Sequence, residues 1–145
     1  MQKTLRFALF GNAFQAHKSA HIAHLLDILR RKEAQISISS EFHDFLRHHT
    51  RTDLGGLEVF EGNNFSADMV LSIGGDGTFL KAASRVGNKE IPILGINTGR
   101  LGFLADISPD QMEETFEEIY RGEYQAESRR VLKLTCNGQV LKGYP

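Results

Sequence analysis

Residues 68–80, with the sequence DMVLSIGGDGTFL, place a short apolar run directly before a glycine turn and the start of a helix. The apolar run is typical of a buried parallel strand, and the pattern of residues 78–86 favours an amphipathic helix. Gly74, Gly75 and Gly77 lie between the two and let the backbone turn sharply and approach a ligand without obstruction from Cβ atoms. The stretch therefore predicts a strand, a turn and a helix, with a ligand site at the turn.

The rest of the chain repeats this alternation of strands and helices. Strands are predicted at 5–10, 34–40, 57–60, 68–73 and 91–96, and helices at 20–29, 41–49, 78–86 and 110–120. The strand at 34–40 alternates apolar and polar residues and is expected to be half-exposed. Ser108 is predicted to cap the last helix, with Pro109 in its first turn and Gly122 near its end. This order predicts an α/β fold with a doubly wound, mostly parallel sheet and helices on both faces.

The last segment of the chain breaks this rhythm. Residues 131–141 form two short strand-like runs around Asn137 and Gly138, a pair typical of a tight antiparallel turn. Because so short a segment cannot build a core of its own, we expect an α/β domain over 1–126 and the first hairpin of an incomplete, β-rich domain over 127–145. Unpaired hairpin edges would favour association with another chain.

Composition and charge restrict the classes of partner. The 145 residues are 41% hydrophobic and 24% charged, as in an ordinary globular domain. Seventeen Lys and Arg against eighteen Asp and Glu give a net charge of −1 without a basic block, which argues against nucleic acid and anionic membranes as partners. No run approaches the roughly twenty apolar residues of a spanning helix, and the single cysteine, Cys136, fits a reducing cytoplasm.

Asp76 is the candidate catalytic residue. The first N–H groups of the following helix suit phosphate or ribose oxygens. A carboxylate does not attract phosphate, so Asp76 is expected to orient a hydroxyl, to accept its proton during transfer, or to help hold a metal ion. The alternative from the local pattern is that Asp76 only caps a helix that begins near Thr78, in an ordinary turn.

Two motifs carry a resemblance to a known family. The sequence GGDGTFL resembles the signature of the NAD kinases, and a looser GGDG turn is shared by diacylglycerol and sphingosine kinases and by phosphofructokinases. Farther along, residues 95–104, GINTGRLGFL, are similar to the G-x-N-x-G-x-L-G-F-L stretch of NAD kinases. The resemblance implies an NAD kinase/phosphofructokinase-like N-terminal domain, truncated at the start of the second domain, because the family's Asn-Glu or Asn-Asp motif beyond the hairpin is not in this chain.

The resemblance also implies an activity and a set of site residues. The family transfers a phosphoryl group from ATP or polyphosphate to the 2′-hydroxyl of the adenosine ribose of NAD, giving NADP, and Asp76 would accept the proton of that hydroxyl. The expected nucleotide-binding residues are Gly74, Gly75, Gly77, Thr78, Lys81, Asn97, Phe103 and Leu104. A divalent metal, expected to be Mg²⁺, would neutralise phosphate charge. The complete protein is expected to be a cytoplasmic homo-oligomer.

Several alternatives stay open at this point. A lipid kinase would share the GGDGT turn but has no reason to carry NTGRLGFL, and a non-catalytic module would use the turn to sense NAD or ATP. Because the rest of the NAD pocket would lie in the second domain, residues 1–145 alone are expected to be inactive. His17, His21 and His24 share a helical face, yet no Cys, Asp or Glu is placed to complete a metal site. The Gly11-Asn12 pair after the first strand is either a plain turn or a place for donor phosphates.

Overall fold

The computed structural model describes residues 4–11, 19–98, 107–123, 132–136 and 139–143. In the first part of the chain, strands and helices alternate: β1 (Arg6–Gly11), α1 (Ser19–Arg31), β2 (Gln35–Ser39), α2 (Ser40–His49), β3 (Glu58–Phe60), β4 (Met69–Gly74), α3 (Asp76–Val86), β5 (Ile93–Asn97) and α4 (Met112–Tyr120). Short 3₁₀ turns follow α3 and precede α4, at Gly87–Lys89 and Pro109–Gln111. The hairpin strands are β6 (Leu132–Cys136) and β7 (Gln139–Gly143).

Five strands form one sheet in the order β3-β2-β1-β4-β5, and every neighbouring pair is parallel. The chain first builds outward from β1 to β3 and then returns to β4 on the other side of β1, so the strand order reverses between β1 and β4. This is the arrangement of a doubly wound sheet, whose ligands bind beyond the carboxyl ends of the strands at the reversal point. The predicted fold class is confirmed.

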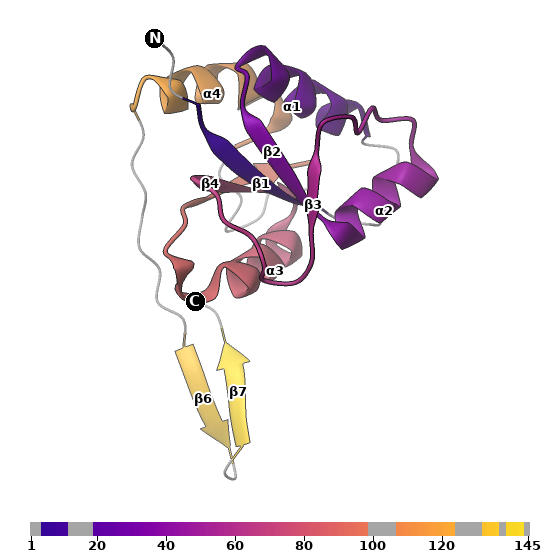
Figure 1. The fold of residues 1–145 in the computed structure, drawn as a ribbon. Helices are drawn as coiled ribbons and strands as arrows, with labels where there is room; N and C mark the ends of the chain where they lie inside the picture. The colour runs from indigo at the N-terminus through magenta and orange to yellow at the C-terminus, as the bar shows by residue number, and fades with distance from the viewer. Residues whose placement is uncertain (1–3, 12–18, 99–106, 124–131, 137–138, 144–145) are drawn as a thin grey trace.

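The two faces of this sheet are covered by different helices (Figure 1). Side chains alternate along β1, so that Phe7 and Leu9 face α1, α2 and α4, whereas Ala8 and Phe10 face α3. We call these the three-helix face and the α3 face. On the three-helix face, the ring of Phe7 meets Phe116 of α4 edge to face, with 5.7 Å between centroids. The hydrophobic core is therefore divided into two layers by the sheet.

Strand β2 has the half-exposed pattern that its alternating sequence predicts. Ile36 and Ile38 are buried on the three-helix face, while Gln35 is exposed and Ser37 is half-buried on the α3 face. The strand ends at Ser39, whose hydroxyl accepts a hydrogen bond from the backbone N–H of Phe42 and so caps α2.

Three elements, α3, β5 and α4, start two residues away from the prediction. Helix α3 begins at Asp76 rather than near Thr78, because the chain enters helical geometry directly after Gly75. Strand β5 begins at Ile93 rather than at residue 91: Pro92 precedes the strand, and its carbonyl accepts a hydrogen bond from the N–H of Val70. Proline has no N–H to give to a ladder, which is consistent with its place outside the strand.

The last helix begins at Met112 rather than at residue 110, because Pro109–Gln111 form a 3₁₀ turn, whereas its flanking signals and the hairpin follow the prediction. The N–H of Ser108 donates to Oε1 of Gln111 at 2.9 Å, Pro109 opens the 3₁₀ turn before α4, and Gly122 has a φ of 75° just beyond the helix. Strands β6 and β7 pair antiparallel as a separate sheet. Asn137 and Gly138 lie outside the described residues, as does the expected domain boundary near residue 126, which stays a prediction. Among the helices described, none has the length and apolar character needed to cross a membrane.

Candidate functional site

The glycine turn lies at the carboxyl end of β4 and leads directly into α3. Gly75 is the residue before the helix, with extended backbone angles of φ −120° and ψ −160°, and as a glycine it has no side chain to cap the helix. The carbonyl of Gly75 accepts the hydrogen bond of the Phe79 N–H, so the helix is regular from its first turn. Asp76 is the first residue of the helix and Gly75 is the residue before it, so the helix does not begin near Thr78; the role of the Asp76 side chain stays a prediction.

The turn is open to a ligand on the side where the glycines lie. An ideal Cβ built on Gly75 or on Gly77 would meet no heavy atom of the described residues within 4 Å, and Gly77 is exposed. The first N–H groups of an α-helix have no partner within the helix and carry the positive end of its dipole. Backbone donors and the half-buried Asp76 are therefore side by side at an accessible edge of the sheet.

The start of the second motif is held against this turn by backbone hydrogen bonds. Asn97, at the end of β5, is in register with Gly74, and the N–H of Thr98 donates to the carbonyl of Gly74 at 3.1 Å. On its other side, the N–H of Asn97 donates to the carbonyl of Ile107 at 2.8 Å. The fold thus brings Asp76 and Asn97, which are far apart in the sequence, to neighbouring strand ends. The hydrogen bond from Thr98 to Gly74 joins two main-chain groups, so it could not be predicted from the type of residue at position 98.

Gly11 has a structural role at the same edge of the sheet. It ends β1 in register with Ile73, directly at the reversal point between β1 and β4. An ideal Cβ on Gly11 would come within 2.2 Å of the ring of Phe42, a buried residue of α2. Glycine at position 11 is required by packing, so its presence is no evidence for a phosphate site. Asn12 lies outside the described residues.

Of the remaining predicted site residues, two lie in α3 and two lie outside the described residues. Thr78 is half-buried in the first turn of α3, and Lys81 is exposed one turn farther along. Phe103 and Leu104 lie outside the described residues, so their expected contacts with NAD stay a prediction. Within the described ranges, no group of three or more His, Cys, Asp or Glu side chains is arranged to hold a metal ion. Instead, His24 lies 3.1 Å from a carboxylate oxygen of Glu113.

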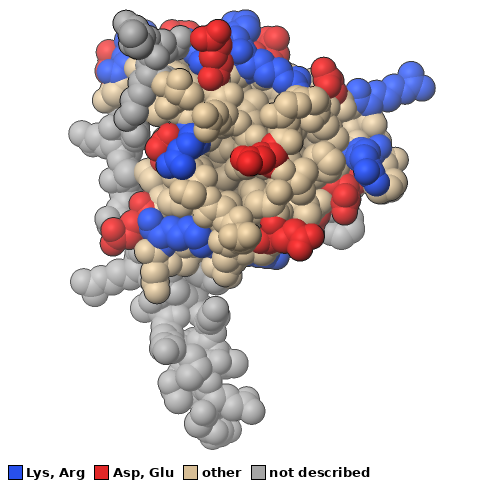
Figure 2. Space-filling model, in the orientation of Figure 1, with Lys and Arg blue, Asp and Glu red and all other residues tan. Residues whose placement is uncertain are grey.

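Charged side chains of both signs are interspersed over the face shown in Figure 2, with no extended field of one sign. This agrees with the near balance of acidic and basic residues in the sequence. Recognition of an anion by this domain therefore depends on local groups, such as the N–H donors of the turn, rather than on a broad basic surface.

Comparisons with known proteins agree with this placement of the motifs. Residues 23–124 match the family model described as the ATP-NAD kinase N-terminal domain. The NAD kinase of Bacteroides fragilis is 56% identical over 141 residues, which are 97% of this chain and 49% of that protein. The NAD kinase of Cytophaga hutchinsonii is 37% identical, over 92% of this chain and 47% of that protein. The chain thus spans about half the length of the curated relatives it matches.

Two solved structures have a similar fold. Yeast NADH kinase complexed with NADH superposes with a TM-score of 0.73 at 17% identity, over 96% of this chain and 46% of that one. The NAD kinase of Archaeoglobus fulgidus in complex with ATP superposes with a TM-score of 0.56 at 23% identity, over 94% of this chain and 45% of that one. At these identities the likeness concerns the fold alone. Through its family match over residues 23–124, which holds both the glycine turn and Asn97, the chain belongs to the NAD kinase family.

Proposed function

We propose that this domain is the part of an NAD kinase that supplies the proton acceptor and the first phosphate-binding turn. The reaction transfers a phosphoryl group from ATP or polyphosphate to the 2′-hydroxyl of the adenosine ribose of NAD, forming NADP. The observation that supports this proposal is the open glycine turn, which presents helix N–H donors beside the carboxylate of Asp76. The yeast relative was solved with NADH and the Archaeoglobus relative with ATP, the two ligand classes that the reaction requires.

Asp76 serves the proposed reaction as the proton acceptor. As the ribose 2′-oxygen attacks the terminal phosphorus, the bond from that phosphorus to the leaving phosphate breaks and the hydroxyl proton passes to the carboxylate. Phosphoryl transfer relies on position and electrostatics more than on a strong base. A half-buried carboxylate at a helix start fits this role, because a rigid backbone orients it while the site stays accessible.

Phosphate and ribose oxygens would be held by the turn around Asp76. The backbone of Gly75 and Gly77 permits close approach, and Thr78 adds a hydroxyl in the first turn of α3. Gly74 and Asn97 border the site from the ends of β4 and β5. Lys81 would reach a phosphate from the next helical turn, and Phe103 and Leu104 would pack around NAD.

A magnesium ion fits this donor set only as a companion of the phosphates. Among the described side chains, Asp76 is the carboxylate at the turn, and no three-residue metal cluster is present. Mg²⁺ is commonly held by one or two carboxylates, substrate phosphates and waters, so Asp76 and the donor phosphates are suitable ligands. When bound, the ion would neutralise charge on the transferred phosphate.

The other candidate functions have less support. A lipid kinase shares the glycine turn but not the second motif, and the family match is to NAD kinases. A non-catalytic sensor of NAD or ATP would keep the same turn without forming NADP. An assay of NADP formation separates the enzyme from the sensor. We also propose that the complete protein acts in the cytoplasm as a homo-oligomer.

The decisive experiment replaces Asp76 by Asn in a chain that also carries the second half found in the relatives. Asn keeps the size of the side chain and one of its two acceptor oxygens but does not accept the proton, so kcat is expected to fall at least about 100-fold. Asp44→Asn, an exposed change on α2, is the matched control and should leave kcat unchanged. An Asp76→Asn enzyme that folds and keeps nearly full kcat would rule out the proposed role.

Residues 1–145 alone test the division of the site between the two halves. We expect this chain to fold, to bind nucleotide weakly, and to form no measurable NADP, because misplacement of a substrate by about 1 Å costs on the order of 100-fold in rate. Robust NADP formation by the purified chain, in a preparation free of host enzyme, would show that the first domain holds a complete site.

A further inference from the structure

Strand β3 ends the five-stranded sheet, and among the described strands it has a neighbour, β2, on one side only. Figure 1 shows β3 at the front of the sheet, and Figure 2 shows that the surface around it is largely uncharged, with one acidic side chain in its middle. Val59, in the centre of β3, is 47% exposed and is the one large hydrophobic side chain that is exposed among the described residues. An unpaired strand edge offers main-chain N–H and C=O groups to another strand. The outer edge of β3 is therefore a candidate interaction surface.

A second copy of this chain has few ways to pair with this edge. If two β3 strands run antiparallel about a two-fold axis perpendicular to the sheet, each face of the sheet continues into the same face of the second copy. Val59 points to the three-helix face, whereas Glu58 and Phe60 point to the α3 face. Because opposite residues must point to the same face, the register changes in steps of two residues. Val59 then lies opposite Leu57, Val59 or Glu61 of the second copy.

Charge selects one of these three registers. With Val59 opposite Leu57 of the second copy, the two Glu58 carboxylates would lie directly opposite each other, which destabilises a strand pair. With Val59 opposite Glu61 of the second copy, the apolar side chain would meet a carboxylate. With Val59 opposite Val59, the two apolar side chains meet, and Glu58 lies opposite Phe60 of the second copy. This last register covers the exposed Val59 without bringing like charges together.

The same register brings Glu58 of one copy toward Arg85 of the other. Glu58 is exposed and makes no ion pair with a described residue. The guanidinium of Arg85 lies beside Gly62, because an ideal Cβ built on Gly62 would be 3.8 Å from its Nη1 atom. Gly62 is the diagonal neighbour of Glu58 of the second copy, at about 7–8 Å, which long side chains can span. Arg85 already pairs with Glu41 at 3.4 Å, but one carboxylate does not use all five N–H donors of a guanidinium. The two-fold axis makes this contact twice.

We propose that two copies of this chain associate through their β3 edges, antiparallel and with Val59 opposite Val59, so that two five-stranded sheets join into one. A strand of three residues makes a small contact, so the pair should be weak, with a dissociation constant on the order of 100 µM. This surface would be one contact of the homo-oligomer proposed above, and the inference rests on that part of the proposed function. It uses neither Asp76 nor the glycine turn, so its test is independent of NADP formation.

Sedimentation equilibrium of the 145-residue chain, from about 10 µM to about 1 mM, measures the dissociation constant. Val59→Lys should raise it at least about tenfold, and Glu58→Arg or Arg85→Glu alone at least about threefold. An equimolar mixture of the two charge variants should associate as the parent chain does, because both contacts then join opposite charges again. Glu114→Arg, an exposed change on α4, is the control and should have no effect. The proposal is overturned by a parent chain that stays monomeric, by a dimer unaffected by Val59→Lys, or by a mixture no tighter than its components.

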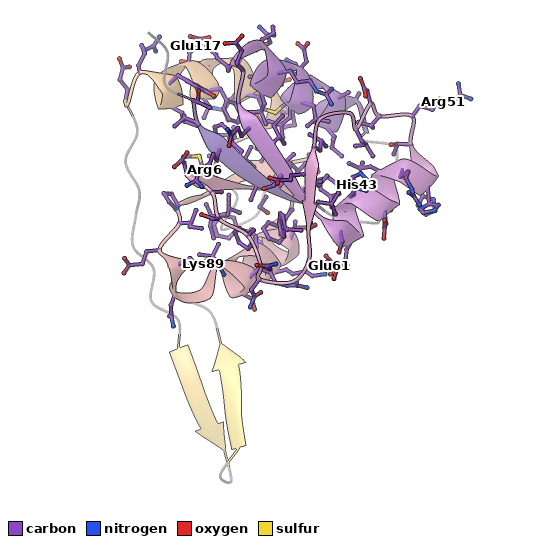
Figure 3. All side chains as sticks on the ribbon, in the orientation of Figure 1. Arg6, His43, Arg51, Glu61, Lys89 and Glu117 are labelled. Carbon is purple, nitrogen blue, oxygen red and sulfur yellow. The ribbon has the colours of Figure 1, made fainter. Side chains whose placement is uncertain are left out.

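Cross-linking tests the register. Opposite residues of an antiparallel pair have Cβ atoms about 4.5–5.5 Å apart, close to the range of a disulfide. In a Cys136→Ser background, Val59→Cys should therefore give a covalent dimer on oxidation with Cu(II)-phenanthroline. Glu61→Cys is the matched control: Glu61 is exposed and Figure 3 shows it near one end of β3. The register sets the two copies of residue 61 roughly 14 Å apart, at about 3.4 Å per residue. Cross-linking of Glu61→Cys as fast as that of Val59→Cys would contradict the proposal.

Discussion

The three-helix face and the α3 face of the sheet differ in how completely they are sealed. On the three-helix face, α1, α2 and α4 bury eighteen hydrophobic residues of the described part of the chain in one cluster, whereas α3 and its surroundings bury seven on the other. The glycine turn leads into α3, and a hollow of about 340 Å³, lined by Arg6, Ser37 and Glu58 among others, lies on the α3 side. Each face holds one buried hydroxyl without a partner among the described residues, Ser72 on the α3 side and Tyr120 on the other. The domain thus holds its stability mainly on one face and keeps access for ligands on the other.

A matched pair of phenylalanine truncations is the strongest way to break this comparison. Phe116 is fully buried on the three-helix face, and Phe60 is 8% exposed at the border of the hollow. Phe116→Ala should cost about 3–5 kcal/mol of unfolding free energy, because the cavity is enclosed on all sides. Phe60→Ala should cost clearly less, since water can enter the space. Urea unfolding of the 145-residue chain, followed by circular dichroism, measures both. Equal losses would show that the faces are equally sealed.

Local sequence patterns were sufficient to predict this layered fold. The apolar runs ending in Gly11 and Gly74 predict buried parallel strands, and the alternation at 34–40 correctly predicts that β2 has one polar side. Boundaries were less accurate where backbone geometry overrides composition. Helix α3 begins at Asp76, two residues earlier than predicted, because Gly75 alone completes the turn. Strand β5 begins at Ile93, so the predicted residues 91 and 92 lie outside it.

Two glycines at the same edge of the sheet give the next test. Gly11→Ala would place a Cβ 2.2 Å from the ring of Phe42, and such overpacking should cost about 1–3 kcal/mol. The Cβ of Gly75→Ala meets no atom of the described residues within 4 Å and the backbone is extended, so stability should change by less than about 0.5 kcal/mol. In the longer protein, Gly75→Ala should nevertheless weaken nucleotide binding. Thermal unfolding of both variants measures these changes. The double variant Gly11→Ala with Phe42→Leu removes the ring that the new Cβ would meet, so part of the stability lost in Gly11→Ala should return if the clash is its cause.

The candidate site shows why sequence alone was insufficient there. The GGDG turn predicts a site near Asp76, and the structure places Asn97 beside it through strand register. Nothing local to Gly11 shows that its glycine is required by Phe42, because that contact depends on how α2 packs over β1. The pairing of His24 with Glu113 likewise joins α1 to α4 across the fold, and periodicity gives no indication of such a partner.

Two serines on the α3 face, Ser37 and Ser72, are expected to give smaller changes in stability. The hydroxyl of Ser72 is buried without a hydrogen-bond partner among the described residues, whereas that of Ser37 donates to the carbonyl of Phe7. Removing an unpaired buried hydroxyl relieves a desolvation cost, so Ser72→Ala should stabilise the chain by up to about 1 kcal/mol. Ser37→Ala should instead destabilise it by about 0.5–1 kcal/mol. Denaturation midpoints give the sign of each change. A loss of stability in Ser72→Ala would mean that the Ser72 hydroxyl makes a stabilising interaction.

The smallest effect is expected from the ion pairs at the rim of the three-helix face. Hydrogen bonds from His24 and then Arg31 hold the pKa of Glu113 below its usual range, and Lys32 does the same for Glu117. A carboxyl whose pKa is lower in the folded state stabilises the fold above its unfolded pKa of about 4.3. That contribution is lost as the pH falls through the folded pKa.

The double change Glu113→Gln and Glu117→Gln should therefore lower stability slightly near neutrality and leave it unchanged at the acidic end of the range, so that stability depends less steeply on pH below about 4.3. The groups are exposed, so screening by salt should reduce the difference between the variant and the parent chain. Glu114→Gln, on the same helix and without an ion pair among the described residues, is the control. Unfolding free energies measured from pH 3 to 7 in low salt test this, and parallel pH curves for the parent and the double variant would show that α4 is held to α1 by its buried residues alone.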